Sequence, residues 1–299
     1  MVSLNFHSRL ENSMKRKNNS DFAIFILTHG RPDRVITYNS LKRAGYTGKL
    51  FIVIDNEDKS AERYRELYGE KVIMFDKAAI AKTFDSGDNF GDRRTIIYAR
   101  NACFEIAKSL GIKYFMQLDD DYTTFQYRFD KEFKYRYKLM YCLDRVIEIM
   151  LEYYKSIPAA SIAMAQGGDF IGGDGGSFAG QLKLSRKCMN TFICSTERPF
   201  KFVGRINEDV NTYTRLASTG LLMFTIPNVS IVQVQTQSNE GGMTEVYLDS
   251  GTYIKSFYTV MYQPSSVRIR LMGDKHQGLH HNIKWTNTVP LILSEDIKK

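Results

Sequence analysis

Two runs of apolar residues, neither interrupted by a polar one, most constrain what this chain can fold into. They extend from Phe22 to Leu27 and from Leu50 to Ile54, and polar residues follow each of them. Such runs are typical of strands that are covered on both faces, which occur mainly in parallel sheets. Pro32 suits the first turn of a helix between the two runs, and Gly45 suits its end. The order strand, helix, strand is therefore predicted.

The same order continues as far as residue 118. A polar helix is predicted from Ala61 to Tyr68, a strand from Lys71 to Phe75, an amphipathic helix from Arg93 to Leu110 and a strand from Tyr114 to Leu118. Alternating strands and helices favour a parallel, doubly wound sheet with right-handed crossovers. The predicted fold class is therefore α/β, with a mostly parallel front half of the kind that binds nucleotides.

The second half of the chain has a different character. A helix is expected over residues 138 to 155, where apolar residues recur on one face. Strand-like segments surround a glycine-dense loop, residues 167 to 176, and they comprise Ser161 to Ala165, Phe178 to Leu184, Leu221 to Ile226 and Ser230 to Val234. We therefore expect a single domain over residues 21 to 285 whose second half is mixed, a polar flexible tail over 1 to 20 and a C-terminal tail over 286 to 299.

The composition is that of a protein with a substantial core and an excess of positive charge. The 299 residues are 43% hydrophobic, and 41 Lys and Arg outnumber 33 Asp and Glu, so the net charge is +8. A polyanion such as DNA or a nucleotide would suit this charge, although many soluble proteins are mildly basic without binding nucleic acid.

Four scattered cysteines form no C-x-x-C pair, which argues against a zinc site or a disulfide framework and favours a reducing compartment. The apolar stretches are too short to span a bilayer, and the basic amino terminus has no apolar segment of the kind found in secretory signals. The sequence therefore predicts a cytoplasmic protein that does not enter membranes.

Three consecutive carboxylates, Asp119, Asp120 and Asp121, follow the strand that is predicted to end at residue 118. Adjacent negative charges repel one another, and a hard cation such as Mg²⁺ or Mn²⁺ is a usual counter-charge because it prefers oxygen ligands. Alternation along the strand would send Asp119 and Asp121 to one side, where they could bind metal, and Asp120 to the other. A solvated turn is the alternative, since Asp favours turns.

Further polar residues are expected at the same edge of the sheet. The first strand ends in Thr28, His29, Gly30 and Arg31, and the second ends in Asp55. Gly30 would let the backbone approach a ligand, and Arg31 could hold a phosphate. Asp55 could accept hydrogen bonds from a base or a ribose. Each residue is ordinary in a loop, so their convergence on one edge carries the prediction.

Two polar pairs lie outside these strand ends. Arg100 and Asn101 belong to the helix before the aspartates; a buried Arg100 would need a carboxylate or phosphate partner, and a surface arginine is the alternative. Glu208 and Asp209 open a later amphipathic segment. Either could act as a general base toward an acceptor hydroxyl, although acidic residues in a first helical turn also serve as caps.

Three of the five histidines, His276, His280 and His281, fall within six positions near the end of the chain. One of them could complete the ligand shell of a metal that two aspartates hold. Surface histidines are the alternative. Neighbours in a chain point in different directions, so either His280 or His281 is expected to be a ligand, but not both.

In combination these motifs resemble the glycosyltransferases of the GT-A fold. That family has an opening strand that ends in a Thr/Arg nucleotide turn, a second strand that ends in Asp, an acidic D-x-D motif, a Glu-Asp pair and a late metal-binding His. Within the fold, residues 97 to 101 (IYARN) ahead of residues 118 to 121 (LDDD) resemble the TET/JBP-associated glycosyltransferases. Those enzymes are implicated in sugar transfer to hydroxymethylated pyrimidines in DNA and occur in phages.

The resemblance implies a GT-A fold and inverting transfer of a sugar from a UDP-sugar, with UDP-glucose the expected donor. The preferred acceptor is a hydroxymethylated pyrimidine in DNA, which would leave the double helix to reach the site. Mn²⁺ or Mg²⁺ would neutralise charge on the departing UDP and would be held by Asp119, Asp121 and His280. Asp209, beside Glu208, would take the proton of the acceptor. Contacts to the donor are expected from Thr28, Gly30, Arg31, Asp55, Arg100, Asn101, Asp119, Asp120 and Asp174.

Other functions stay open from the residues themselves. The acceptor could be a protein or a glycan, or the chain could be a metal-dependent nucleotidyltransferase, although its first strand lacks the Gly-rich turn usual in that class. A non-catalytic nucleic-acid-binding protein would explain the charge but not the aspartates. The sequence contains no G-x-x-x-x-G-K-[ST] loop, which argues against a P-loop kinase.

Overall fold

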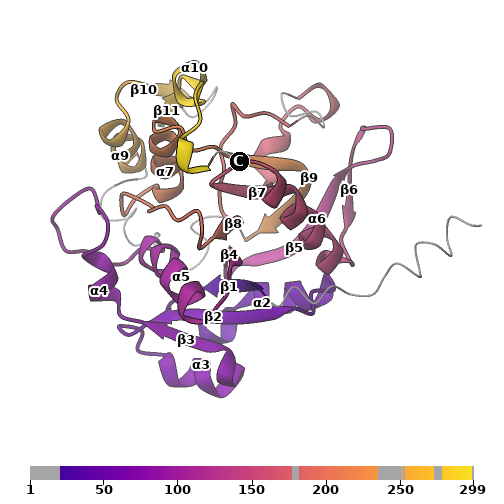
Figure 1. Cartoon of the computed structure of the whole chain (residues 1–299), viewed down its shortest axis with the longest axis vertical. Helices are drawn as coiled ribbons and strands as arrows, with labels where there is room; N and C mark the ends of the chain where they lie inside the picture. The colour runs from indigo at the N-terminus through magenta and orange to yellow at the C-terminus, as the bar shows by residue number, and fades with distance from the viewer. Residues whose placement is uncertain (1–20, 177–181, 235–250, 252, 273–277, 298–299) are drawn as a thin grey trace, which may run out of the picture.

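A sheet of nine strands organises the molecule (Figure 1). The computed structural model describes residues 21–176, 182–234, 251, 253–272 and 278–297. The strands of the sheet are β1 (Phe22–Leu27), β2 (Lys49–Asp55), β3 (Val72–Phe75), β4 (Tyr114–Asp119), β5 (Tyr122–Phe129), β6 (Tyr135–Leu139), β7 (Ser161–Ala165), β8 (Phe192–Ser195) and β9 (Met223–Gln233). Their order across the sheet is β3-β2-β1-β4-β8-β7-β9-β5-β6.

Helices pack on both faces of this sheet. The α-helices are α2 (Ile36–Arg43), α3 (Ala61–Tyr68), α4 (Lys77–Ala81), α5 (Ile97–Ser109), α6 (Leu143–Ser156), α7 (Glu208–Ser218), α9 (Ile254–Tyr262) and α10 (Trp285–Thr288). Single 3₁₀ turns occur at η1 (Pro32–Arg34), η2 (Gly69–Lys71), η3 (Gly167–Phe170), η4 (Gly173–Gly175) and η5 (Glu295–Ile297). A separate two-stranded sheet consists of β10 (Val267–Met272) and β11 (Gly278–Ile283).

The buried position of β1 explains why its sequence does not alternate. All six of its residues are buried, and successive side chains enter different cores. Ile24 packs in a core with Leu41 of α2 and Leu151 of α6. Phe25 packs on the other face, in a core that includes Phe104 of α5. A strand that is covered in this way needs apolar residues at every position.

The front half of the sheet is parallel, as the sequence predicts. β1 pairs in parallel with both β2 and β4, and β2 pairs in parallel with β3. The second half is mixed, since β8 runs antiparallel to β4 and β7, whereas β7 and β9 are parallel. β5 runs antiparallel to β9 and β6. The predicted α/β class with a mixed second half is therefore confirmed.

Three element predictions in the sequence are wrong in part. The helix expected over residues 138 to 155 begins at Leu143, because the preceding residues form the edge strand β6. The two strands expected on either side of Pro227 are one strand, β9, whose pairing with β7 skips from Ile226 to Ser230. A bulge of this kind accommodates a proline that cannot donate a ladder hydrogen bond. The helix expected from Arg93 begins at Ile97.

The strand expected from Phe178 to Leu184 is not seen where the structure describes that stretch. Residues 177–181 lie outside the described residues, and residues 182–184 are not in a strand.

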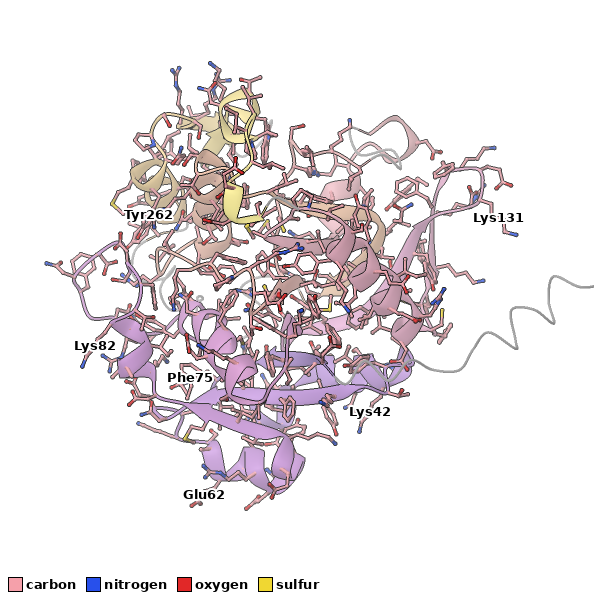
Figure 2. All side chains as sticks on the ribbon, viewed as in Figure 1. Lys42, Glu62, Phe75, Lys82, Lys131 and Tyr262 are labelled. Atoms are coloured by element: carbon pink, nitrogen blue, oxygen red, sulfur yellow. The ribbon has the colours of Figure 1, made fainter. Side chains whose placement is uncertain are left out.

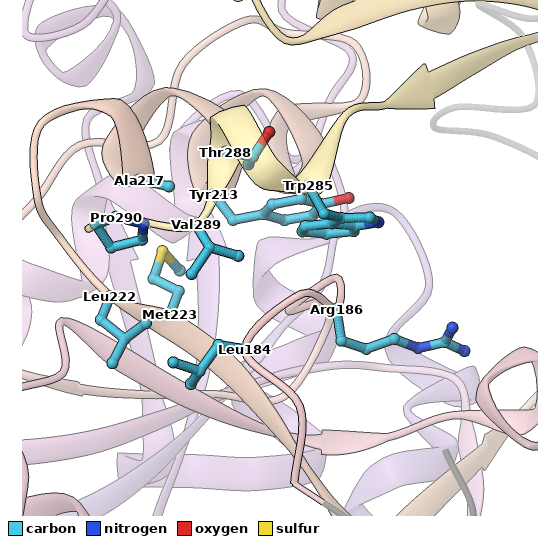
Figure 3. A pocket seen from close by; sticks show the side chains of 10 residues that line it. All are labelled: Leu184, Arg186, Tyr213, Ala217, Leu222, Met223, Trp285, Thr288, Val289 and Pro290. Carbon is cyan, nitrogen blue, oxygen red and sulfur yellow. The ribbon is translucent and has the colours of Figure 1, made fainter. Parts of the chain in front are cut away.

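The last described segment of the chain packs on the rest of the molecule. Trp285 of α10 stacks on Tyr213 of α7, with ring centroids 5.9 Å apart and an interplanar angle of 11° (Figure 3). The Ser294 N–H donates to the carbonyl of Gly220, and Ile297 is buried. Across the part of the chain that the structure describes, no helix is both long and apolar enough to cross a membrane.

Candidate active site

The carboxyl ends of β1, β2 and β4 meet at one edge of the sheet. Leu27, the last residue of β1, is in register with Asp119 at the end of β4 and with Val53 of β2. The residues that follow these strands therefore lie close together, as the parallel arrangement predicts. Gly30 has a φ of +70°, a conformation that glycine adopts at little cost.

Asp120 points into the first turn after β1. Its carboxylate accepts a hydrogen bond of 2.6 Å from the Thr28 hydroxyl and lies 3.1 Å from a guanidinium nitrogen of Arg31. Burial raises the pKa of Asp120, and Arg31 and Thr28 offset that effect in part. Tyr64 of α3 supports the turn, because its hydroxyl accepts from the Arg31 N–H and contacts Thr28. Asp120 thus fixes the loop that contains Arg31.

Asp119 is held from the opposite direction by Arg100, which is 2% exposed. One guanidinium nitrogen of Arg100 lies 2.9 Å from Asp119, and Nε lies 3.0 Å from a carboxylate oxygen of Glu208. Burial and the neighbouring Asp209 carboxylate raise the pKa of Glu208 to about 7, despite this ion pair. The prediction that a buried Arg100 contacts a carboxylate is confirmed, and the partners are two carboxylates from different elements.

Asp121 differs from its two neighbours. Among the described residues, no Lys or Arg forms an ion pair with its carboxylate. Burial, followed by repulsion from Asp119 and Asp120, raises the pKa of Asp121 to about 7. A carboxylate in this environment is stabilised by any cation that approaches it. Asp121 is therefore the acidic side chain at this edge whose charge is least compensated by the described protein.

Asp55, at the end of β2, belongs to a network of charged groups. It lies 2.7 Å from Nδ1 of His29 and 3.2 Å from Nζ of Lys77, and these partners lower its pKa although burial alone would raise it. Asp58 accepts a hydrogen bond of 2.7 Å from the Gly30 N–H. The sequence reasoning did not assign a role to Asp58 or Lys77, since neither lies in a motif.

Asp209 is buried at the start of α7, beside Glu208. Its side chain accepts a 2.7 Å hydrogen bond from the N–H of Val210, an arrangement in which an acidic residue also favours the helix N-terminus. Burial is the largest influence on the pKa of Asp209 and raises it, while Arg100 and Lys187 partly lower it. Asp209 is the acidic residue of this pair that makes no ion pair with Arg100 in the described part of the chain.

Asn101 and Asp174, which the sequence also predicted as donor contacts, have partners within the protein as well. The Asn101 side chain donates to the carbonyl of Phe202 and accepts from its N–H, which joins α5 to the segment before α7. Asp174 accepts a hydrogen bond from the Tyr135 N–H and so joins the glycine-dense loop to β6. Their contacts to a donor stay predictions.

Two of the late histidines, His280 and His281, lie on β11, where His280 is exposed and in register with Arg270 of β10. Burial, together with Lys255, His280 and Lys187, lowers the pKa of His281 to about 4. His276 lies outside the described residues. No contact joins His280 to the aspartates within the described chain, so its assignment as a metal ligand stays a prediction.

The aspartates fit a hard divalent cation in their chemistry. Asp119 and Asp121 supply oxygen donors, and a nearby cation would offset the burial and the like charge that raise the pKa of Asp121. Over the described ranges, no group of three or more His, Cys, Asp and Glu side chains is arranged so that it could hold a metal by itself. A cation bound by these two aspartates would need further ligands from its substrate, from water or from other residues.

A pocket elsewhere lies between the start of β9 and α10 (Figure 3). Its empty volume is about 240 Å³, including space that is open to solvent. The lining is mostly apolar and consists of Leu184, Arg186, Tyr213, Ala217, Leu222, Met223, Trp285, Thr288, Val289 and Pro290. Among the residues that the structure describes, no carboxylate or histidine lines this pocket, so the described lining does not supply acid-base chemistry.

Comparison with solved structures finds distant similarities. A mycobacterial protein is 9% identical, with a TM-score of 0.43, over 88% of this chain and 83% of that chain. Staphylococcus aureus TarS 1–349 in complex with UDP-GlcNAc is 11% identical, with a TM-score of 0.42, over 80% and 66%. Glucosyl-3-phosphoglycerate synthase from Mycobacterium tuberculosis, in complex with Mg²⁺ and UDP, is 8% identical, with a TM-score of 0.41, over 88% and 87%.

No curated protein matches the sequence. The family model of the TET-associated glycosyltransferases does match, and it spans residues 22–242, from the start of β1 through the aspartates and the Glu208-Asp209 pair. This span is more than half of the 299 residues. The resemblance expected from the motifs is therefore confirmed, and the chain belongs to the TET-associated glycosyltransferase family.

Proposed function

We propose that this glycosyltransferase is metal-dependent and inverting, and that it moves glucose from UDP-glucose to the hydroxyl of a hydroxymethylated pyrimidine in DNA. Family membership supports sugar transfer. The observation that carries the metal dependence is the under-compensated carboxylate of Asp121, beside an edge that already contains Asp119 and Arg31. The net charge of +8 favours a polyanionic acceptor. We place the reaction in the cytoplasm, which for a phage-encoded enzyme is the cytoplasm of the host.

The donor would lie across the carboxyl ends of β1, β2 and β4. Asp55 and the Gly30 turn would contact the nucleoside, and Arg31 would approach the diphosphate. Asp119 and Asp121, with His280 as the predicted third ligand, would hold Mn²⁺ or Mg²⁺. When bound, the metal supplies positive charge that stabilises the departing UDP.

Asp209 would act as the general base. The acceptor hydroxyl gives its proton to the Asp209 carboxylate while its oxygen forms a bond to C1 of glucose, and the C1–O bond to UDP breaks with its electron pair. This single displacement inverts the configuration at C1. A buried carboxylate with a raised pKa is suited to this task, because general bases work best when their pKa lies near the pH of the reaction.

The test is a transfer assay on a short duplex that contains 5-hydroxymethylcytosine or 5-hydroxymethyluracil, with the unmodified duplex as a control. Release of UDP and a hexose-modified nucleoside are expected with Mn²⁺ or Mg²⁺, and neither is expected with EDTA. A β-linked glucoside would establish inversion. Transfer that persists in EDTA would contradict the metal, and release of pyrophosphate in place of UDP would indicate a nucleotidyltransferase.

The general base is tested by Asp209→Asn, which should lower kcat by about 10² to 10⁴ and leave donor binding intact. Glu62→Gln, an exposed carboxylate on α3, is the matched control and should retain full activity. If the two variants were equally active, Asp209 would not be the base.

A further inference from the structure

The hairpin of β5 and β6 extends from the side of the molecule opposite β3. β6 is the last strand of the sheet and pairs with β5 alone. The turn between the strands, residues 130–134, lies at the periphery, and Figure 2 shows Lys131 at its outer tip. We refer to residues 129–141 as the hairpin arm.

The hairpin arm carries a net positive charge, because its four basic side chains outnumber its two carboxylates, Asp130 and Glu132. Lys131, Lys134, Arg136 and Lys138 are all exposed. Arg136 lies 3.3 Å from Asp130, but no described carboxylate lies within ion-pair distance of the three lysines. Lysines on an edge strand commonly prevent unwanted pairing with other strands, which would explain the charge alone.

Exposed aromatic rings on the same arm are not explained by protection of an edge. Phe133 is 66% exposed, Tyr137 is 70% exposed and Tyr141 is 68% exposed. Solvent-exposed aromatic rings make an edge strand more prone to associate with other molecules. Exposed basic and aromatic side chains on the same arm therefore indicate a binding surface. Aromatic side chains that alternate with basic ones are typical of surfaces that bind nucleic acid.

Phe133 also occupies a conformation that its side chain disfavours. Its φ is +57°, in the left-handed region, where glycine or asparagine would be less strained. The ring gains little from packing in return, since most of it is exposed. A bulky ring in this position is therefore presented outward by the turn at a cost in local stability.

The end of the hairpin arm next to the turn is held against the molecule through Tyr135, the first residue of β6. Tyr135 stacks on Phe170, with centroids 5.5 Å apart, and the guanidinium of Arg128 lies 4.7 Å from the Phe170 ring centroid. Asp174 accepts the Tyr135 N–H. These contacts to η3 and the glycine-dense loop fix the position of the turn, while the side chains of residues 131–134 stay exposed to a partner.

We propose that the hairpin arm binds the DNA duplex that flanks the acceptor base, with its lysines on phosphates and Phe133 against the sugar or base edges. This inference rests on the DNA acceptor of the proposed function. Charge complementarity selects a polyanion, and a two-stranded ribbon fits the major groove of B-DNA. The arm is a binding element and takes no part in the transfer chemistry.

The length of β5 sets where this contact falls. Asp130 lies nine residues beyond Asp121, with the eight residues of β5 between them, and a strand advances about 3.3 Å per residue, so the tip lies about 30 Å from the aspartates. At about 3.4 Å per base pair, this distance corresponds to about nine base pairs along the duplex. A duplex with four base pairs on each side of the acceptor base would be too short to reach the tip.

The test compares two triple variants of equal charge by fluorescence anisotropy on a 30-base-pair duplex with a central hydroxymethylated base. Lys131→Ala/Lys134→Ala/Lys138→Ala removes exposed charge from the arm, and Lys59→Ala/Lys82→Ala/Lys108→Ala removes exposed charge elsewhere. The arm variant should bind at least tenfold more weakly at 50 mM salt. Its plot of log K against log salt should be shallower by about 0.9 for each lost phosphate contact. On the nine-base-pair duplex the two variants should bind alike.

Phe133→Gly tests the ring without disturbing the turn, because glycine favours the left-handed conformation. We expect an unchanged or higher melting temperature, binding that is several-fold weaker and an unchanged salt dependence. A ring that served only the fold would give the reverse pattern, with lower stability and unchanged binding.

The possible outcomes distinguish a failure of the hairpin arm to bind DNA from a failure of the proposed function. If both triple variants bind the long duplex equally, or if the wild-type protein binds phosphatidylserine vesicles and not DNA, the inference is overturned. Sugar transfer to the nine-base-pair duplex by the arm variant would show that the chemistry is independent of the arm. If DNA binding follows the expected pattern but no sugar is transferred to any duplex, the inference that the arm binds DNA is supported and the assignment of DNA as the acceptor is wrong.

Discussion

Burial changes the pKa in opposite directions in two regions of the molecule, the aspartates at the end of β4 and the histidines of β11. Burial and like charge raise the pKa of Asp121 to about 7, so the folded protein favours positive charge or a proton there. Burial and nearby Lys187 and Lys255 lower the pKa of His281 to about 4, so positive charge is disfavoured around it. Lys187 also lowers the pKa of Asp209, which links the surroundings of β11 to the start of α7.

This contrast distinguishes two kinds of site in one protein. The aspartate edge suits a cation, whereas the lysines around His281 suit an anion such as a phosphate group. A metal bound to a diphosphate has both charges, and it would satisfy both regions at once.

Asp121→Asn should reduce sugar transfer by about 10³ to 10⁴, which corresponds to roughly 4–5.5 kcal/mol of transition-state stabilisation. The free energy of unfolding should stay unchanged or rise, because the substitution removes repulsion among three neighbouring carboxylates. Steady-state kinetics and urea denaturation measure the two effects. Asp33→Asn, at an exposed carboxylate that pairs with Arg63, is the control and should be fully active. Normal activity in Asp121→Asn would remove the reason for treating the edge as a cation site.

Arg100→Met should lower the free energy of unfolding by about 3–5 kcal/mol, because it leaves two buried carboxylates without their counter-charge. Urea denaturation at pH 7.5 measures the loss. Arg136→Met in the hairpin arm removes an exposed arginine with one carboxylate partner, and no measurable change in stability is expected. Equal losses in the two variants would mean that burial does not decide the importance of these ion pairs.

His281→Gln should change the pH dependence of stability rather than its value at neutral pH. The folded pKa of about 4 lies below the ordinary 6.5, so the unfolded chain takes up a proton first as the pH falls. The wild-type protein therefore loses stability between about pH 7 and pH 4, and the variant lacks this contribution. Urea denaturation at pH 7.5, 6 and 5 should show the difference moving in favour of the variant. Parallel curves would contradict the lowered pKa.

The front half of the fold was predictable because local and tertiary preferences agree there. The apolar run of β1 and the amphipathic pattern of α3 each specify one element, and α3 has the predicted bounds. β6 was missed because its exposed residues carry no apolar pattern, and a helix was assigned to the residues before Leu143. An edge strand that is stabilised mainly by its pairing with β5 needs no apolar pattern of its own, so its sequence does not predict it.

The candidate site was predictable mainly where residues lie at or just after strand ends, and Arg100 of α5 is the exception. Thr28, Arg31, Asp55 and the three aspartates converge because parallel strands end together. Lys77 could not be inferred, since its contact with Asp55 depends on how α4 follows β3. The partners of Asn101 and Asp174 were also beyond the sequence, because each contact joins segments that are distant along the chain.

The position of Arg100 has a consequence for how this protein is made. Its two ion-pair partners come from β4 and from α7, which lie 19 and 108 residues further along the chain. In a nascent chain in which α7 has not yet been synthesised, the Arg100 guanidinium lacks Glu208, one of its two carboxylate partners. The part of the chain before α7 therefore lacks one of the two carboxylates that pair with Arg100, and cutting the chain before α7 would separate the members of one ion-pair network.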